Sequence, residues 1–161
     1  MFIRLLNWTE EACARLGTSA AAVREVCWRV VPARTGRHLT LLLYALEGTG
    51  AHGEYVPGWW TPQDIHGGTV PGLPARSLVI RVGLGCDNTY PHATHDAYGW
   101  AWRFQGVLDQ LALLIAHELY HLSQPSFARQ RASNEQHANA YAVKHVQDLG
   151  FAVTGGPDDG R

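Results

Sequence analysis

The spacing of apolar residues predicts a long amphipathic helix over residues 104–123. Apolar side chains recur there at intervals of three or four, which places them on one helix face. This stripe consists of Phe104, Leu108, Leu111 and Ile115. Pro125 follows and is expected to end the helix. A last helix is expected over residues 134–149, because Ser133 and Gln136 have the spacing of a capping box in front of it.

Helical signals also open the chain. Thr9 is expected to cap a first helix, which Gly17 ends. The segment 18–26 either continues this helix or forms a second one. β-branched and aromatic residues then predict a strand over Val26–Val31, which Pro32 ends.

The middle of the chain has the pattern of strands joined by turns. The apolar segments His38–Leu46 and Ser77–Gly83 predict two strands. Between them, segments 53–60 and 67–74 are rich in glycine and proline and predict a hairpin or loop. Segment 85–99 contains glycine, proline, asparagine and aspartate, and it predicts a loop before the long helix.

This order of elements predicts an α+β fold. We expect a small, twisted, mainly antiparallel sheet with an N-terminal helix, followed by the two C-terminal helices. The chain has 161 residues, of which 46% are hydrophobic and 17% charged, and this balance is typical of one globular domain. We therefore expect a single domain over residues 1–155 and a frayed tail over residues 156–161.

Charge and cysteine content narrow the class of protein. The formal net charge is -1, so no strong field would attract nucleic acid or an anionic membrane. No apolar segment approaches the roughly 18 residues of a membrane span. The three cysteines are scattered and form no CxxC pair, which favours free thiols in a reducing compartment. A cytoplasmic protein is expected.

The motif H-E-x-x-H carries the clearest chemistry. It consists of His117, Glu118 and His121 and lies late in the long helix. Residues four apart share a helix face, so the two imidazoles can converge on one zinc ion. Glu118 is about 100° around the helix, where it can reach a water on the metal without binding the metal itself. A helix end that carries histidines because they suit the helix dipole is the structural alternative.

A catalytic zinc site needs a third protein ligand, and Glu135 and His137 compete for that role. The face of Glu135 is largely apolar, with Ala138 and Ala142 on it, so it should point inward. His137 is roughly 200° away from Glu135, on a polar face. An inward acid needs a partner, which a metal supplies. Glu135 is therefore the predicted ligand, although the helix dipole alone also favours an acid in a first turn.

The two motifs together resemble a known family. H-E-x-x-H followed by E-x-x-A-N-x-[aromatic]-A, here Glu135 to Ala142, is similar to the ImmA/IrrE group of gluzincin-type zinc metallopeptidases. The resemblance covers the two C-terminal helices. Tyr120 stands where that family usually has glycine, and the spacer between the motifs is shorter than usual. The resemblance implies a zincin-like (minigluzincin) fold, one Zn²⁺ per chain and hydrolysis of a protein or peptide substrate.

These observations predict a mechanism with residues in defined roles. Glu118 would act as the general base toward a zinc-activated water. Asn139, on the same face as Glu135, is a candidate to form a hydrogen bond with one of the metal ligands and so hold it in position. Candidates to stabilise the oxyanion of the reaction are Tyr90, His92, His95 and Tyr141. The strand Ser77–Gly83 could be an edge that pairs with an extended peptide.

Two other functions fit the same motif. The first is a SprT-like protease that acts on DNA-bound protein with His137 as the third ligand, although the net charge of -1 gives it little support. The second is a non-catalytic binding module in which zinc braces two helices. A structural zinc is usually closed by four protein ligands, so a fourth ligand such as His92, His95 or His145 would favour that function.

Overall fold

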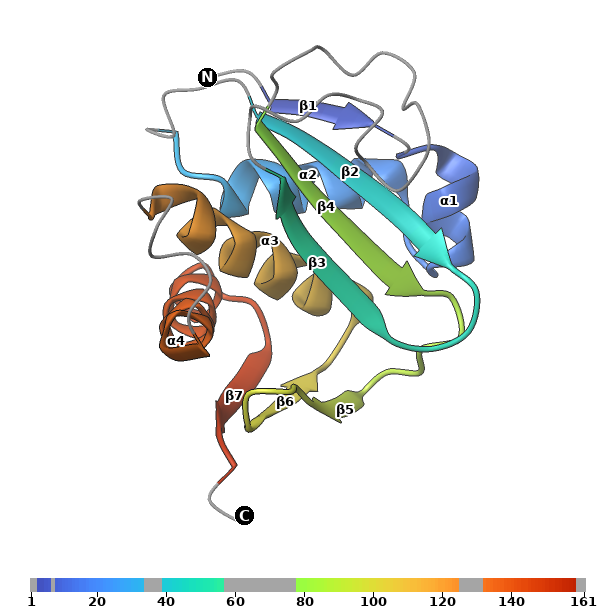
Figure 1. Ribbon diagram of the computed structural model, residues 1–161. Helices are drawn as coiled ribbons and strands as arrows, with labels where there is room; N and C mark the ends of the chain where they lie inside the picture. The colour runs from blue at the N-terminus through green and yellow to red at the C-terminus, as the bar shows by residue number, and fades with distance from the viewer. Residues whose placement is uncertain (1–2, 7, 34–38, 57–77, 125–131, 159–161) are drawn as a thin grey trace.

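The computed structural model describes residues 3–6, 8–33, 39–56, 78–124 and 132–158. Within these ranges it has four helices and two sheets, which confirms the α+β class (Figure 1). The helices are α1 (Glu10–Arg15), α2 (Ala20–Val30), α3 (Val107–Ser123) and α4 (Ala132–Asp148). The strands are β1 (Ile3–Leu6), β2 (Leu39–Leu46), β3 (Ala51–Val56), β4 (Leu78–Gly85), β5 (His92–His95), β6 (Trp100–Phe104) and β7 (Val153–Pro157).

The larger sheet is mixed, with strand order β1-β2-β4-β3. β1 and β2 are parallel, β2 and β4 are parallel, and only β3 runs antiparallel to its neighbour β4. The expectation of a mainly antiparallel sheet is therefore wrong for this sheet. β1 and β2 can pair in parallel because α1 and α2 lie between them in the chain, and a crossover of this length allows parallel pairing. The strand β1 was not expected from the sequence.

β4 lies between β2 and β3, although β2 and β3 follow each other directly in the chain. The connection between them passes over the end of β4, where Cys86 donates a hydrogen bond to the carbonyl of Leu46. A side chain at Gly85 would lie 2.5 Å from the carbonyl oxygen of Gly48, so this crossing requires glycine. The side chain of Asn88 pairs with the backbone N–H and carbonyl of Gly50, both at 2.8 Å.

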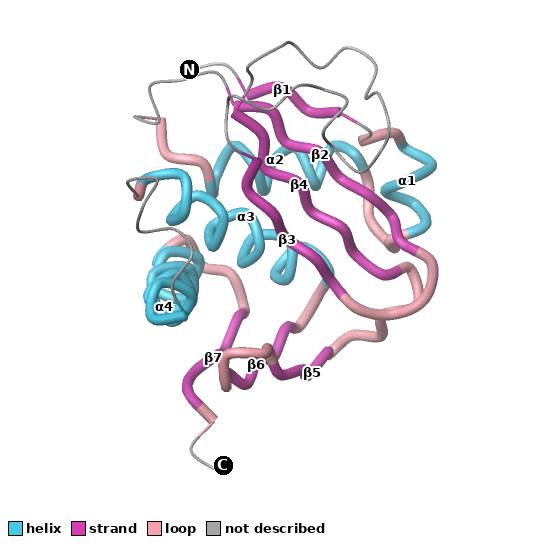
Figure 2. Tube along the Cα trace, viewed as in Figure 1, coloured by secondary structure: helices cyan, strands magenta, loops and turns pink. Residues whose placement is uncertain are grey.

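This topology corrects the prediction of the edge strand. The predicted strand Ser77–Gly83 corresponds to β4, which is internal. Among the described residues the edges of this sheet are β1 and β3, and residues 53–56 of β3 come from the segment expected to be a hairpin or loop. α3 packs against β3 and β4 (Figure 2). The edge strand β3 therefore lies beside α3, the helix that carries the H-E-x-x-H motif.

The second sheet is antiparallel, with order β5-β6-β7. Its first strand, β5, lies inside the segment 85–99 that was predicted to be a loop. Its last strand, β7, pairs Gly156 and Pro157 with β6, so the expected fraying does not apply to these two residues. Residues 159–161 of the predicted tail lie outside the described residues. Because β6 precedes α3 and β7 follows α4, their pairing brings the start of α3 close to the end of α4.

The predicted strand Val26–Val31 is wrong, because α2 continues through Val30. Its buried residues recur at helical spacing and are Ala20, Val23, Val26, Cys27 and Val30. Packing of this face outweighs the β propensity of valine and tryptophan. The first helix is as expected: Thr9 accepts a hydrogen bond from the N–H of Ala12, and Gly17 follows the helix end with a φ of 72°.

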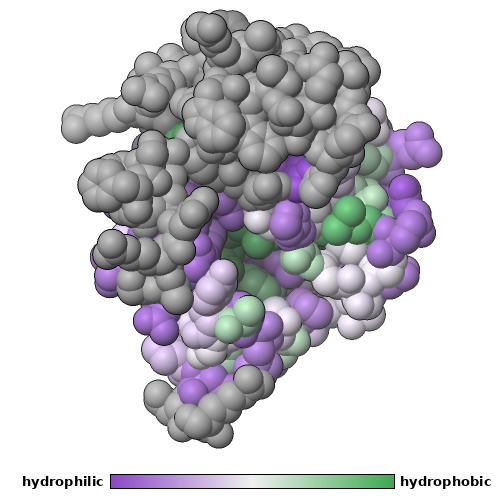
Figure 3. Space-filling view, in the orientation of Figure 1, coloured by the Kyte–Doolittle hydropathy of each residue, from purple (hydrophilic) through white to green (hydrophobic). Residues whose placement is uncertain are grey.

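The core lies between the larger sheet and the helices on one of its faces. From the sheet it contains Leu39, Leu41, Leu43, Ile80, Val82 and Leu84, all fully buried. The predicted stripe supplies Leu111 and Ile115 from α3, whereas Phe104 lies on β6. Figure 3 shows apolar residues in the centre of the visible face, where α3 lies between β3 and the small sheet. This packing fixes α3 in place.

Gly155 and Gly156 provide a matched test of the small sheet. A Cβ at Gly155 would lie 2.2 Å from the ring of Trp102, whereas one at Gly156 has no atom within 4 Å. We expect Gly155→Ala to lower the free energy of unfolding by about 1–3 kcal/mol because the ring must move. Gly156→Ala should change it by no more than about 0.5 kcal/mol. Equal effects in urea denaturation would contradict the packing described for Trp102.

Candidate metal site

α3 brings the two motif histidines together. His117 and His121 are four residues apart and therefore share a helix face. Their rings are 4.8 Å apart between centroids, and their Nε2 atoms lie 3.0 Å from each other. Neither ring is freely solvated, since the side chains are 18% and 8% exposed. Two ring nitrogens at this separation can bind the same ion.

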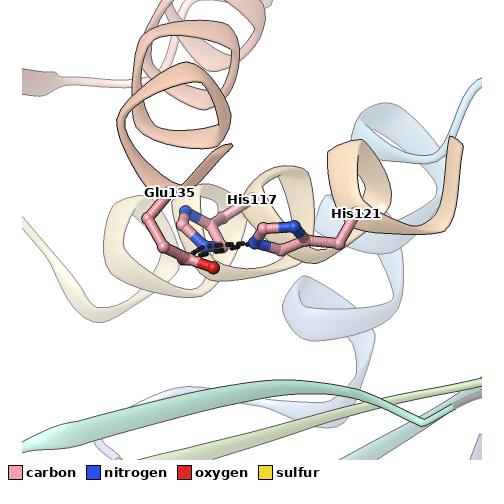
Figure 4. A group of neighbouring side chains, drawn as sticks. All are labelled: His117, His121 and Glu135. Carbon is pink, nitrogen blue, oxygen red and sulfur yellow. Dashed lines mark hydrogen bonds and ion pairs between the residues drawn. The ribbon is translucent and has the colours of Figure 1, made fainter. Parts of the chain in front are cut away.

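α4 adds the carboxylate of Glu135 to this pair (Figure 4). Its Oε2 lies 3.1 Å from Nε2 of His117 and 3.3 Å from Nε2 of His121. The three ligand atoms all lie within 4.8 Å of one another. His117, His121 and Glu135 thus form a group that could hold a metal ion, and among the described residues it is the one such group.

The pKa values of His117 and Glu135 are shifted by their interaction with each other. Burial lowers the pKa of His117, but hydrogen bonding to Glu135 and the charges of Glu118 and Glu135 outweigh it, so this pKa is raised. For Glu135, burial raises the pKa, but the two histidines outweigh burial and lower it. The carboxylate is therefore ionised at neutral pH, which is the form that binds a cation.

Two asparagines of α4 lie near these histidines. Asn139, which the sequence predicted to be a supporting residue, is 3% exposed, and its amide contributes to raising the pKa of His117. The amide of Asn134 lies 3.4 Å from Nδ1 of His121. Sequence reasoning missed Asn134, although it directly precedes Glu135. Contacts of this kind hold a ligand ring in one orientation.

The site is also connected to the turn between β5 and β6 through Asp96. Oδ1 of Asp96 accepts hydrogen bonds from the backbone N–H of Tyr98 at 2.8 Å and of Trp100 at 3.0 Å. Oδ2 accepts from the indole N–H of Trp102 at 3.2 Å and from the amide of Asn139 at 2.6 Å. One carboxylate therefore joins the turn to an asparagine of α4.

Glu118 lies next to the group without belonging to it. Its residue is 6% exposed, and it faces β3 at Gly53. A Cβ at Gly53 would lie 2.9 Å from Oε1 of Glu118, so glycine leaves room for this carboxylate. Glu118 is therefore placed between the metal group and the edge strand.

The other predicted site residues lie elsewhere. His137 is exposed, as its helix face predicted, and is not part of the metal group. The hydroxyl of Tyr90 donates to Gln110, near the start of α3, at 2.5 Å. The ring of His92 stacks on Phe104.

Two further candidates also have other partners. His95 pairs with Asp158 at 3.2 Å. Tyr141 stacks on His145, whose Nε2 lies 2.8 Å from the carbonyl oxygen of Val30. These contacts give no support to an oxyanion role for the four candidates. His145 and the other proposed fourth ligands are likewise outside the metal group.

Tyr98 is a candidate that sequence reasoning missed. It lies in the turn from Asp96 to Gly99 and is 44% exposed. The negative charge of Glu135 is the largest of the influences that raise the pKa of Tyr98, ahead of burial and the charge of Asp96. The spacing of Asp96 and Gly99 is typical of a tight turn and could have indicated that Tyr98 lies at its tip.

The cysteines take no part in this site. Cys13 and Cys27 are buried and Cys86 is half-buried, and all three are free thiols. Burial raises the pKa of both Cys13 and Cys27, so these thiols stay protonated. They are therefore poor ligands and poor nucleophiles.

Comparisons with protein-family models, with curated proteins and with solved structures found no match to this chain. In the described part of the chain, no helix has the length and apolar character needed to cross a membrane.

Metal binding can be tested with matched variants of α4. Glu135→Gln should weaken binding of a divalent metal by more than the roughly 10- to 100-fold expected for a supporting residue, because an ionised ligand is lost. His137→Ala, two residues away and exposed, should leave the metal content unchanged. The measurement is metal bound per chain after dialysis, by elemental analysis. Loss of metal in His137→Ala alone would contradict the assignment of Glu135.

Proposed function

We propose that this chain is a zinc-dependent metallopeptidase of the gluzincin type, which hydrolyses peptide bonds in a protein or peptide substrate. The triangle formed by His117, His121 and Glu135, with edges of 3.0, 3.1 and 3.3 Å, carries the proposal. Tetrahedral zinc with ligand distances of about 2.0–2.2 Å separates neighbouring ligand atoms by about 3.3–3.5 Å. The side chains therefore suit zinc with little movement.

The number of ligands favours a catalytic site. Structural zinc sites are usually closed by four protein ligands, whereas catalytic sites have three and keep a position for water or substrate. Among the described residues, the group has three members. This composition supports hydrolysis over a module in which zinc only braces two helices.

Glu118 supplies the proton transfer in this proposal. Zinc, when bound, polarises the substrate carbonyl and lowers the pKa of a water molecule. The Glu118 carboxylate takes a proton from the attacking water and delivers it to the nitrogen of the leaving amine. Its burial beside Gly53 supports this role, because a carboxylate with restricted solvent access is held toward the substrate.

The edge strand offers a place for the substrate. β3 is an edge among the described residues, and it passes Glu118 at Gly53. An extended peptide can add to such an edge through backbone hydrogen bonds. A peptide on this edge would have a peptide bond near Glu118. The candidate for substrate pairing is therefore β3 and not β4, the strand considered for this role from the sequence.

Tyr98 is our candidate for stabilising the negative charge that develops on the substrate carbonyl oxygen. Its side chain is exposed, and the charge of Glu135 raises its pKa further above neutrality, so the hydroxyl is protonated at neutral pH. A protonated hydroxyl can donate a hydrogen bond to an oxyanion. The hydrogen bond from its backbone N–H to Asp96 holds the turn in position.

The Glu118→Gln variant tests the proposed function. We expect it to bind zinc as the unchanged chain does but to lose turnover, because the amide cannot accept the proton from water. Cleavage of fluorescently labelled casein and zinc content should be measured on the same preparations. A Glu118→Gln variant that cleaves casein as fast as the unchanged chain, or an unchanged chain that binds no zinc, would overturn the proposal.

The Tyr98→Phe variant tests the oxyanion role. Removing one donor of this kind typically lowers kcat by about 100-fold or more, and KM should change little. Tyr44→Phe is the matched control, because Tyr44 lies on β2 beside Gly83, facing away from the core side on which α3 packs. Equal kcat for Tyr98→Phe and Tyr44→Phe, at equal zinc content, would assign the oxyanion role to another group.

A further inference from the structure

The backbone groups of β3 alternate between two directions. The N–H of Gly85 donates a hydrogen bond at 2.9 Å to the carbonyl oxygen of Gly50, which lies one residue before the pair of Ala51 with Leu84. In an antiparallel pair of strands, residues that exchange hydrogen bonds alternate with residues that exchange none. Ala51 therefore exchanges no backbone hydrogen bond with β4, and its N–H and C=O groups face away from that strand.

Every second residue of β3 shares the direction of Ala51. By the same alternation, the backbone groups of Gly53 and Tyr55 face away from β4. Those of His52 and Glu54 face β4 and pair with it. On its outer side, β3 has no neighbouring strand among the described residues. β3 thus presents backbone donors and acceptors at three positions to a chain placed along this edge.

The side chains at this edge leave room above α3. Gly53 faces Glu118, since a Cβ at Gly53 would lie 2.9 Å from Oε1 of that residue. Ala51 lies on the same face of β3, because it is two residues from Gly53, and it is exposed with only a methyl group as its side chain. Side chains of a peptide placed opposite these two residues would point to the same face, toward α3. The small residues of β3 therefore avoid a clash with them.

We infer that the substrate is an extended segment of a protein, whose backbone pairs with β3 at every second residue around Gly53. The inference deepens the proposed function and rests on it, because Gly53 is the position of β3 that faces the proposed general base Glu118. Main-chain hydrogen bonds then supply affinity whatever side chains the substrate carries. Proline is excluded at the paired positions, because it has no N–H to donate.

An N-methyl scan of a cleaved peptide tests the pairing. The probe is the shortest casein peptide that the zinc-loaded chain cleaves, identified by mass spectrometry. It is resynthesised with one backbone N–H at a time replaced by N–CH₃, and the amide that is cut is left unmodified. We expect kcat/KM to fall by about 10-fold at every second position, where a hydrogen bond to β3 is lost. At the positions between, it should fall by no more than about 3-fold, because those N–H groups face away from β3.

Amide hydrogen exchange, measured by NMR on the zinc-loaded Glu118→Gln variant, locates the pairing on β3. Without peptide, the N–H groups of Ala51 and Gly53 should exchange faster than that of His52, which is bonded to β4. With the unmodified casein peptide bound to roughly nine-tenths of the chains, exchange at Ala51 and Gly53 should slow by about 10-fold. His52 is the matched control, because its N–H is paired in both states and its exchange should change much less.

Equal effects of N-methylation at neighbouring positions would overturn the inference, as would unchanged exchange at Ala51 and Gly53 in the complex. Slow exchange of these two amides without peptide would also overturn it, because the edge would then already be paired. In each of these cases the proposed function stands if casein is cleaved and Glu118→Gln is inactive. A zinc-loaded chain that cleaves no casein overturns the proposed function, and the inference with it.

Discussion

The close contact between α3 and α4 is the constraint on which the metal group depends. The two histidines belong to one helix and the carboxylate to the other, so the group exists only if the helices approach closely. Both helices contain fully buried alanines, which are Ala112 and Ala116 on α3 and Ala138 and Ala142 on α4. Small side chains let packed helices approach closely, and separation of α3 from α4 would leave the half-buried carboxylate of Glu135 without its histidine partners.

The two sheets adjoin the α3–α4 contact at different places. The larger sheet supports α3 from one side and, because β4 lies inside it, presents β3 as its edge beside Glu118. The small sheet joins the start of α3 to the end of α4 and carries the turn that holds Asp96 and Tyr98. In the proposed function, the larger sheet offers its edge β3 to an extended substrate, and the small sheet carries the turn that holds Tyr98.

The sequence predicted those parts of the site that depend on local geometry. Helical spacing was sufficient to pair His117 with His121, and the apolar face of α4 was sufficient to prefer Glu135 to His137. It did not reveal that β4 inserts between β2 and β3, or that segment 85–99 contains a strand, because pairing between distant segments decides both. The placement of Asp96 and Tyr98 in the turn depends on that pairing. For Val26–Val31, tertiary packing reversed the preference of the individual residues.

The place of β7 at the end of the described chain has a consequence for biosynthesis. Proteins leave the ribosome with their N-terminal parts first, so α3 and the β5–β6 hairpin emerge before α4 and β7 exist. At that stage the nascent chain carries the histidine pair but lacks its carboxylate partner and the third strand of the small sheet. Assembly of the metal group therefore waits until α4 has been translated.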